Sequence, residues 1–332
     1  MRVLITAPIT ESGLNELRDA GLEIDYHSWL ETGKLHLGGS LLHTIKSGNY
    51  DIVVVEGDEI KEEIIQHTDL KLIGSVRGSP NNISLPAATA KKIPVIAAPG
   101  RNTIAVAEHT IALILAQARK VVAADRLLKN EYFVDDFKDF GNMYKNLRGF
   151  ELSGRTTGII GLGQIGYEVA KRLQVFGVQI LVFDPYVDSR KIEEVGGRSV
   201  ELDELLKNSD IITIHCPSTE ETTGLLGTEE FEKMKKTAIL INTARASVID
   251  EHALLNALKS GVIAGAGLDV FSMEPVDSDN DFLELDNVTV MPHMGGNTYE
   301  TLERQTRVIV ENILAFVKGE RPKNILNMEV YE

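Results

Sequence analysis

Three side chains of complementary chemistry follow strand-like runs in the second half of the sequence. Arg245 lies in NTARASVIDE, Glu274 in LDVFSMEP and His293 in VMPHMGGNT. A guanidinium can hold a carboxylate in a two-pronged fork and polarise the carbonyl beside it. An imidazolium can donate a proton as a hydride arrives, and a neighbouring carboxylate can orient and charge that imidazole. We therefore predict that these residues interconvert a 2-oxo acid and a 2-hydroxy acid.

A glycine-rich turn predicts a binding place for the cofactor that carries the hydride. The sequence GLGQIG at 161–166 stands between the strand-like run TTGII and a helical segment. Within this pattern, Gly161 permits a tight turn and Gly163 lets the backbone approach a pyrophosphate. Gly166 lets the helix and the strand pack closely, and the helix N-terminus faces the phosphates. The context matches the mechanism, so we predict a dinucleotide site.

The carboxylate of Asp184 is expected to select the type of dinucleotide. It ends the next strand-like run, 23 residues after Gly161 (184 − 161). There it would bind the adenosine ribose hydroxyls and repel the 2′-phosphate of NADP. Arg190 and Lys191 follow closely in sequence, so NADP stays open. We predict NAD as the cofactor.

Short apolar runs that alternate with helical patterns must position these residues. In the first hundred residues the strand-like runs are 3–6, 22–26, 51–55, 71–76 and 93–97. In the second half they are 156–160, 179–184, 210–217, 238–243, 264–270 and 288–292. Repetition of strand and helix predicts parallel sheets covered on both faces, in an α/β architecture of two halves. Residues that follow parallel strands share one edge of the sheet, which is where we expect the site.

Two helical segments and one irregular segment complete the pattern. A long helix is predicted over about 103–130, and an amphipathic helix over about 299–318. The intervening segment 131–153 is rich in aromatic residues and has no clear period, so it is either an arm over another surface or a plain surface loop. The long helix and the arm at 131–150 present more apolar surface than one domain can cover, and we predict a homodimer.

The composition excludes several classes of partner. The chain has 332 residues, enough for two domains at about 150 residues each. Its net charge of −15 disfavours nucleic acid and anionic membranes. Cys216 is the only cysteine, and the histidines lack metal-ligand spacing, so we expect neither a disulfide within the chain nor a metal site. The N-terminus leads straight into a strand and predicts a cytoplasmic protein.

Over nearly its whole length the chain resembles the D-isomer-specific 2-hydroxyacid dehydrogenases. The motifs that carry the resemblance are GLGQIG, FDPY, HCPSTEETTGLL, INTARASVIDE, GAGLDVFSMEP and MPHMGG. The resemblance implies a Rossmann-like NAD-binding domain at 102–295, inserted into a flavodoxin-like substrate (catalytic) domain made of 1–101 and 296–332. It implies an NAD-dependent D-2-hydroxyacid dehydrogenase with Arg245, Glu274 and His293 as its catalytic residues. It also implies dimers that form through the helix near 103–125 and its following arm.

The same resemblance assigns further residues to the site. Asp269 would bind the nicotinamide amide, and we interpret His215 and Cys216 as packing groups beside the cofactor. The residues expected to contact the cofactor are Gly161, Gly163, Gln164, Ile165, Gly166, Asp184, Cys216, Pro217, Thr222, Thr243, Ala244, Arg245, Asp269, His293 and Gly295. Those expected to contact the substrate are Arg77, Gly78, Ser79, Arg245 and His293.

One departure from the family pattern bears on the substrate. Where phosphoglycerate dehydrogenases usually place an arginine for the substrate phosphate, this chain has Glu56. A carboxylate there would repel a phosphate, accept hydrogen bonds from substrate hydroxyls or pair with Arg77. We therefore predict a small unphosphorylated acid of the hydroxypyruvate, glyoxylate or glycerate type, with 3-phosphoglycerate as the alternative.

Two alternatives concern the class of protein. Corepressors that sense NAD(H) share this fold and keep many of the catalytic residues, so the sequence leaves such a binding protein open. Formate dehydrogenases also resemble the chain, but they carry glutamine where Glu274 stands.

Overall fold

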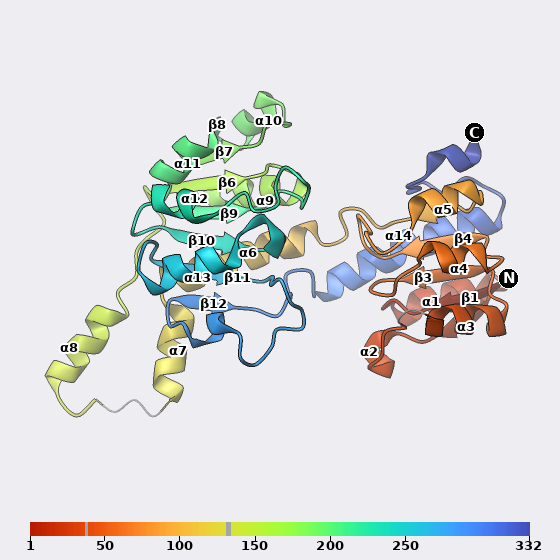
Figure 1. Cartoon of the computed structure of the whole chain (residues 1–332), viewed down its shortest axis with the longest axis horizontal. Helices are drawn as coiled ribbons and strands as arrows, with labels where there is room; N and C mark the ends of the chain where they lie inside the picture. The colour runs from red at the N-terminus through yellow and green to blue at the C-terminus, as the bar shows by residue number, and fades with distance from the viewer. Residues whose placement is uncertain (37–38, 131–133) are drawn as a thin grey trace. The chain divides into compact units, whose positions relative to one another are not determined.

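The computed structural model of the chain divides into two compact units (Figure 1). The first comprises Met1–Arg101 and Asn297–Glu332, and the second comprises Asn102–Gly296. The structure describes residues 1–36, 39–130 and 134–332. In those ranges no helix is long and apolar enough to cross a membrane.

The first unit is built on a five-stranded parallel sheet in the order β2-β1-β3-β4-β5. Its strands are β1 (Arg2–Ile5), β2 (Glu23–Tyr26), β3 (Ile52–Val55), β4 (Leu72–Ser75) and β5 (Val95–Ile96). Its helices are α1 (Glu11–Asp19), α2 (Trp29–Thr32), α3 (Gly39–Gly48), α4 (Glu62–Gln66), α5 (Leu85–Ala90) and α14 (Tyr299–Val317), and the turn η3 (Met328–Tyr331) follows.

Helices cover both faces of this sheet, which explains why its central strand β3, with the sequence IVVV, is apolar and buried at every position. Val3 and Ile5 point to the face covered by α1 and α14. Leu4, between them, points to the face covered by α3, α4 and α5. The strand repeat of two residues therefore divides one apolar run between two cores.

The second unit is built on a seven-stranded parallel sheet in the order β12-β11-β10-β9-β6-β7-β8. Its strands are β6 (Thr156–Ile160), β7 (Gln179–Phe183), β8 (Gly197–Ser199), β9 (Ile211–Ile214), β10 (Ile239–Asn242), β11 (Gly265–Leu268) and β12 (Val288–Val290). Its helices are α6 (Thr103–Ala118), α7 (Val121–Lys129), α8 (Phe137–Asn146), α9 (Gln164–Gln174), α10 (Ser189–Glu194), α11 (Leu202–Asn208), α12 (Thr228–Lys233) and α13 (Glu251–Lys259). Two short turns, η1 (Ala246–Val248) and η2 (Asp281–Glu284), lie in its loops.

This sheet is also covered on both faces, and α6 and α9 lie on one of them. Helices α11, α12 and α13 cover the other (Figure 1). The predicted fold class, two parallel-sheet α/β halves, is confirmed. Strand β8 was not predicted, because its three residues, GRS, carry no apolar pattern.

The predicted helix over 103–130 is two helices, so that prediction is wrong in detail. Helix α6 ends at Ala118, and α7 begins at Val121 after Lys120, whose φ is 55°. The carbonyl oxygen of Ala118 accepts a hydrogen bond from the N–H of Phe150 at 2.8 Å. A returning segment far away in sequence thus occupies the carbonyl where the helix breaks, which periodicity within 103–130 could not reveal.

Part of the predicted aromatic segment is a helix, α8, which the irregular pattern did not predict. None of the residues of α7 or α8 is buried. Within the second unit both helices project away from the sheet (Figure 1). Residues 131–133 of the predicted arm lie outside the described residues.

Candidate active site

His293 and Glu274 follow neighbouring strands, and their side chains contact each other. Glu274 lies in the loop after β11, and His293 lies just after β12, which pairs with β11. The Nδ1 atom of His293 donates to Oε2 of Glu274 at 2.7 Å. Their side chains are 50% and 34% exposed, so both groups remain accessible to a ligand. The ring's second nitrogen is therefore left to exchange a proton with a bound substrate.

The carboxylate of Glu274 is positioned by its own loop. Its Oε1 accepts the backbone N–H of Phe271 at 3.0 Å, which leaves Oε2 directed to the imidazole. Phe271 is buried, so this hydrogen bond ties the loop to the core of the unit. The loop is fastened a second time where the N–H of Ser272 donates to Glu251 at 2.8 Å.

His293 adopts the left-handed backbone conformation, with a φ of 56°. This conformation costs a residue other than glycine on the order of 1 kcal/mol, and surrounding contacts must maintain it. Those contacts come from Asp269, whose two oxygens accept the N–H groups of Met294 at 2.7 Å and Gly295 at 2.8 Å. Asp269 is buried, and its two hydrogen bonds hold the turn that carries the imidazole.

Asp269 was predicted to bind the nicotinamide amide, and in the structure its carboxylate makes contacts within the protein. Both of its oxygens bind backbone N–H groups, and His109 of α6 places Nε2 3.2 Å from Oδ1. That approach lies within ion-pair distance but lacks hydrogen-bond geometry. The part of Asp269 in holding the His293 turn could not be recognised from sequence, because it depends on backbone groups 25 and 26 residues away.

Arg245 follows β10, and its side chain is exposed. The backbone around it is set by Asn242, whose amide donates to the carbonyl of Arg245 and accepts from Ala244, both at 3.0 Å. The Nη1 atom of Arg245 donates to the carbonyl of Ala244 at 2.6 Å. This single bond occupies one of the five N–H donors, so the guanidinium keeps the capacity to hold a carboxylate in a fork.

The glycine-rich turn between β6 and α9 is tight enough to require its glycines. Gly161 has a φ of 89°, and a Cβ there would lie 2.6 Å from the backbone nitrogen of Cys216, which follows β9. A Cβ on Gly166 would lie 2.2 Å from the carbonyl oxygen of Gly161. Gly163, by contrast, faces open space. Strands β6 and β9 are where the strand order reverses, so the turn lies where a dinucleotide binds in such sheets.

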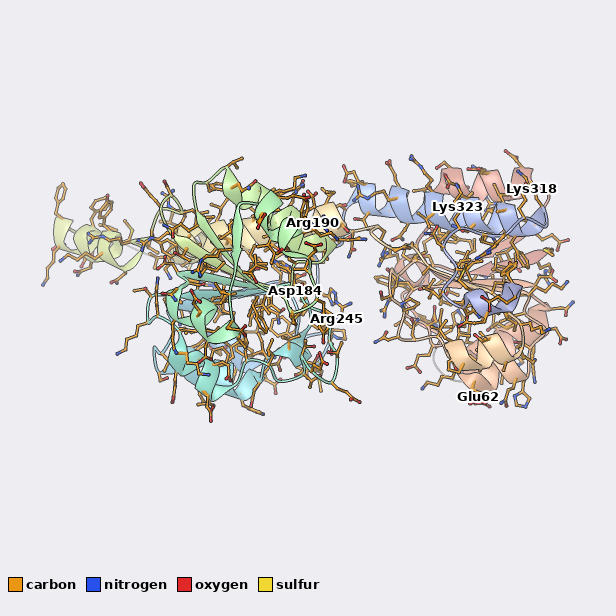
Figure 2. All side chains as sticks on the ribbon, turned by 90° about the horizontal axis from the view of Figure 1, so that it is seen from above. Glu62, Asp184, Arg190, Arg245, Lys318 and Lys323 are labelled. Atoms are coloured by element: carbon orange, nitrogen blue, oxygen red, sulfur yellow. The ribbon has the colours of Figure 1, made fainter. Side chains whose placement is uncertain are left out.

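Asp184, labelled with Arg245 in Figure 2, braces this turn. Its two oxygens accept the N–H groups of Leu162 at 2.7 Å and Tyr186 at 2.9 Å. Arg190 makes a 2.8 Å ion pair with Asp188, which holds the pKa of the Asp188 carboxyl below its usual range. Arg190, one of the two cations that left NADP open, thus has an acidic partner of its own.

His215 and Cys216, which follow β9 and were predicted to pack beside the cofactor, are both uncharged groups. Burial lowers the pKa of His215 to about 3, and Thr213 contacts its Nε2 at 2.9 Å, so the ring is neutral at physiological pH. Burial raises the pKa of the Cys216 thiol to about 11, so it is not a thiolate nucleophile. The Thr222 hydroxyl donates to the Pro217 carbonyl at 2.6 Å and closes the loop that follows.

The other predicted cofactor residues lie near these strand ends. Gln164 and Ile165 begin α9, directly after Gly163. Thr243 follows β10, and its hydroxyl forms a 2.8 Å hydrogen bond with the hydroxyl of Thr110 on α6. Across the described ranges, no group of three or more His, Cys, Asp or Glu side chains could hold a metal ion.

The predicted substrate loop, Arg77, Gly78 and Ser79, belongs to the first unit and follows β4. Arg77 donates to Asn81 at 3.3 Å. Glu56 follows β3. One of its carboxylate oxygens accepts a hydrogen bond from Arg101 at 2.8 Å, and the other accepts one from Trp29 at 3.0 Å. Arg101, which lies 45 residues away in sequence, was not predicted as a partner of Glu56.

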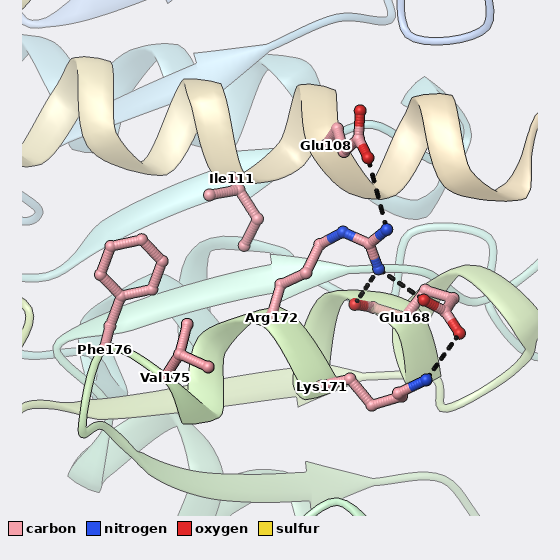
Figure 3. Close-up of a pocket in the computed structure, with 7 residues that line it drawn as sticks. All are labelled: Glu108, Ile111, Glu168, Lys171, Arg172, Val175 and Phe176. Carbon is pink, nitrogen blue, oxygen red and sulfur yellow. Dashed lines mark hydrogen bonds and ion pairs between the residues drawn. The ribbon is translucent and has the colours of Figure 1, made fainter.

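A groove in the second unit contains none of the predicted site residues. It lies between α6 and α9 and is lined by Glu108, Ile111, Glu168, Lys171, Arg172, Val175 and Phe176 (Figure 3). Its charged side chains pair with one another, as in the 3.4 Å contact between Arg172 and Glu108. We therefore place the chemistry at the strand ends and not in this groove.

Comparison with known proteins agrees with the fold and defines the class of protein, a dinucleotide-dependent dehydrogenase. Residues 111–295 match the sequence profile described as D-isomer specific 2-hydroxyacid dehydrogenase, NAD binding domain. The chain belongs to this family, and the predictions of family, enzyme class and NAD as cofactor are confirmed.

Two relatives and one solved structure illustrate the similarity. A D-3-phosphoglycerate dehydrogenase from Archaeoglobus fulgidus is 39% identical over 100% of this chain, which spans 60% of that relative's length. A glyoxylate reductase from Korarchaeum cryptofilum is 36% identical over 99% of this chain and 96% of its own length. The crystal structure of the TT0316 protein from Thermus thermophilus is 33% identical with a TM-score of 0.87, covering 98% of this chain and all of that one.

Proposed function

We propose that the protein uses NADH to reduce a small, unphosphorylated 2-oxo acid to its D-2-hydroxy acid, with glyoxylate and hydroxypyruvate as the best candidates. The observation that carries this proposal is the 2.7 Å contact between His293 and Glu274, beside Arg245 on the same sheet edge. Relatives named glyoxylate reductase, matched over nearly their whole length, support the substrate class.

In this proposal each side chain has one task. Arg245 binds the carboxylate of the 2-oxo acid and polarises its C2 carbonyl. His293, charged and oriented by Glu274, donates a proton to the carbonyl oxygen, which becomes the hydroxyl. In the oxidative direction the neutral imidazole takes that proton back. Arg77 and the backbone of Gly78 and Ser79 would complete the binding of the carboxylate.

The residues around the glycine-rich turn fit NAD. Gly161 and Gly166 leave no room for a Cβ, Gly163 leaves the turn open, and Asp184 offers a carboxylate with no arginine directly after it. When bound, NADH supplies the hydride that adds to C2 of the substrate. This chain's residues would hold the pyrophosphate at the start of α9 and the ribose hydroxyls at Asp184.

The test is NADH consumption with glyoxylate, hydroxypyruvate and phosphohydroxypyruvate, measured as kcat/KM. We expect both unphosphorylated acids to be reduced and hydroxypyruvate to be preferred over its phosphorylated form. A clear preference for phosphohydroxypyruvate would overturn the substrate assignment and favour the second candidate, a 3-phosphoglycerate dehydrogenase, which the Archaeoglobus fulgidus relative supports. NADH binding without turnover of any 2-oxo acid would favour an NAD(H)-sensing binding protein.

We also propose that the protein is a homodimer formed through α7 and α8. Their exposed apolar side chains include Leu128, Phe137, Phe140 and Tyr144, and Phe137 is 93% exposed. Aromatic surface of this kind is typical of subunit interfaces. Sedimentation at micromolar concentration should give a dimer, and Phe137→Glu with Tyr144→Glu should shift it to a monomer. A monomeric wild-type protein would contradict this proposal.

For localisation we propose the cytoplasm. Its support is that Cys216, the single cysteine, has no partner within the chain, as is usual in a reducing compartment. Fractionation of the source cells should recover the protein with the cytosolic fraction, and recovery elsewhere would contradict the proposal.

A further inference from the structure

The first unit contains a compact polar cluster made of Glu56, Arg101 and Trp29. Oε1 of Glu56 lies 2.8 Å from Nη2 of Arg101, and Oε2 accepts the indole N–H of Trp29 at 3.0 Å. The Glu56 and Arg101 side chains are only 18% and 16% exposed. An ion pair so little exposed is expensive to separate, because either charge would be left without its partner.

The cluster lies where the topology of this unit predicts a ligand. Trp29, Glu56 and Arg101 follow β2, β3 and β5, so all three stand at the carboxyl ends of parallel strands. In the order β2-β1-β3-β4-β5 the direction of winding reverses between β1 and β3. Open α/β sheets bind their ligands in the crevice at such a point, and Glu56 directly follows β3.

Arg101 cannot turn easily toward another anion. Its Nη1 donates to Oε1 of Gln305 on α14, and the amide of Gln305 donates to the carbonyl of Pro8 at 2.7 Å. Its own carbonyl accepts Nε of Arg304 at 2.7 Å. The guanidinium is therefore fixed by buried Gln305 on one side and by Glu56 on the other.

We infer that Glu56 is a specificity-determining residue that selects a 2-oxo acid with a hydroxyl group at the end remote from its carboxylate. This inference rests on the proposed function and names the substrate end that the first unit recognises. A carboxylate has about four acceptor sites, and two of those on Glu56 are used, so it can accept a hydrogen bond from a hydroxyl. Glu56 also neutralises the charge of Arg101. A substrate phosphate at this position would therefore face a carboxylate and would find no unpaired cation among these three residues.

Matched substrates isolate the hydroxyl group. Hydroxypyruvate differs from pyruvate only by that group, and glyoxylate lacks the remote end altogether. The wild type should prefer hydroxypyruvate to pyruvate in kcat/KM, and Glu56→Gln should lower that preference about tenfold, since the neutral amide is a weaker acceptor. Glyoxylate has no remote end to reach position 56, so Glu56→Gln should lower glyoxylate reduction less than it lowers hydroxypyruvate reduction.

The second comparison, between phosphohydroxypyruvate and hydroxypyruvate, tests the charge on Arg101. In Glu56→Gln the charge on Arg101 is no longer neutralised, so the ratio of phosphohydroxypyruvate to hydroxypyruvate kcat/KM should rise about tenfold or more. Glu56→Gln with Arg101→Met should lose this gain. The control is Glu62→Gln, the same chemical change at an exposed position of α4, labelled in Figure 2 and bonded to Gln66. It should move neither ratio.

Trp29 gives a readout that does not need turnover. It is the only tryptophan of the chain, so the intrinsic tryptophan fluorescence comes from this cluster. Titration with D-glycerate should change the emission at lower concentration than D-lactate does, and Glu56→Gln should remove the difference. If the wild type reduces none of the acids, the proposed function fails, and the titration still decides the specificity. If it reduces them but Glu56→Gln shifts neither ratio, the specificity inference alone is wrong.

Discussion

The carboxyl-end loops of the two sheets hold their charged residues in different ways. After β11 of the seven-stranded sheet, Glu274 accepts a backbone N–H group of its own loop. After β12, His293 lies in a turn whose N–H groups bind Asp269. The side chains of His293 and Glu274 are 50% and 34% exposed. After β3 and β5 of the five-stranded sheet, Glu56 and Arg101 are anchored to each other and to side chains, and are mostly covered.

The difference follows from what each group has to do. A residue that transfers a proton must reach the substrate and change charge, so its position is best fixed through the backbone while its reactive atom stays free. A residue that recognises a substrate keeps its charge, and a paired, covered arrangement gives it a defined direction. Substitutions in each set of loops test whether the residues behave in this way.

Removal of the imidazole should have the largest effect. His293→Ala should lower kcat by about 10²–10⁴, the usual contribution of a general acid or base, with little change in NADH binding. The measurement is steady-state reduction of glyoxylate together with an NADH titration. The matched control is His252→Ala, an exposed histidine on α13 of the same unit, which should retain wild-type kcat. If both variants keep full turnover, the proton donor is another group.

Changing the carboxylate beside the imidazole should have a smaller effect on the same step. Glu274→Gln should lower kcat by roughly 10- to 100-fold, because the variant loses a charged partner of His293 but can still accept the N–H of Phe271. Glu251→Gln alters the bond that fastens the same loop at Ser272 and should lower kcat much less. Equal losses in the two variants would mean that Glu274 acts by anchoring the loop and not on the imidazole.

Replacement of Asp184 should change the choice of cofactor more than the rate. Asp184→Ala should reduce the NADH preference over NADPH by about tenfold, since the carboxylate that repels the 2′-phosphate is lost. The ratio of kcat/KM for NADH and NADPH measures this with glyoxylate held constant. An unchanged ratio would show that Asp184 serves only to brace Leu162 and Tyr186.

How far the sequence predicts this molecule depends on the kind of contact. The strands that position Gly161, Arg245 and His293 are apolar, regularly spaced and followed by polar residues, so local pattern sufficed. The pair of Glu56 and Arg101 was not predicted, because 45 residues separate them and β5, which precedes Arg101, is only two residues long. Their contact depends on the spatial order of the strands, which a pattern along the chain does not contain.

The helices α6, α7 and α8 illustrate a second limit. Apolar spacing predicted one helix that continues through Lys120. In the structure the helix breaks there, and the N–H of Phe150 binds the carbonyl of Ala118 at the end of α6. The aromatic residues of α8 face no core in the described chain, so they follow no core-facing period. Sequence patterns report burial within one fold, and they fail where a distant segment or another surface decides the structure.

The smallest effect is expected at Cys216, beside the glycine-rich turn. Burial raises the pKa of its thiol to about 11, so at pH 8 only about one molecule in a thousand carries a thiolate. Iodoacetamide at pH 8 should therefore leave activity nearly unchanged over an hour, and labelling should accelerate as the pH rises toward 10. Rapid labelling at pH 8 with loss of activity would contradict the packing role assigned to this residue.

The most direct test of the central claim is the configuration of the product. The purified protein is supplied with NADH and hydroxypyruvate, and the glycerate formed is resolved by chiral chromatography while the NADH consumed is measured. The proposed roles of Arg245 and His293 in a D-isomer specific enzyme predict one D-glycerate for each NADH oxidised. L-glycerate, a racemic product, or no NADH oxidation with hydroxypyruvate or glyoxylate would contradict the account.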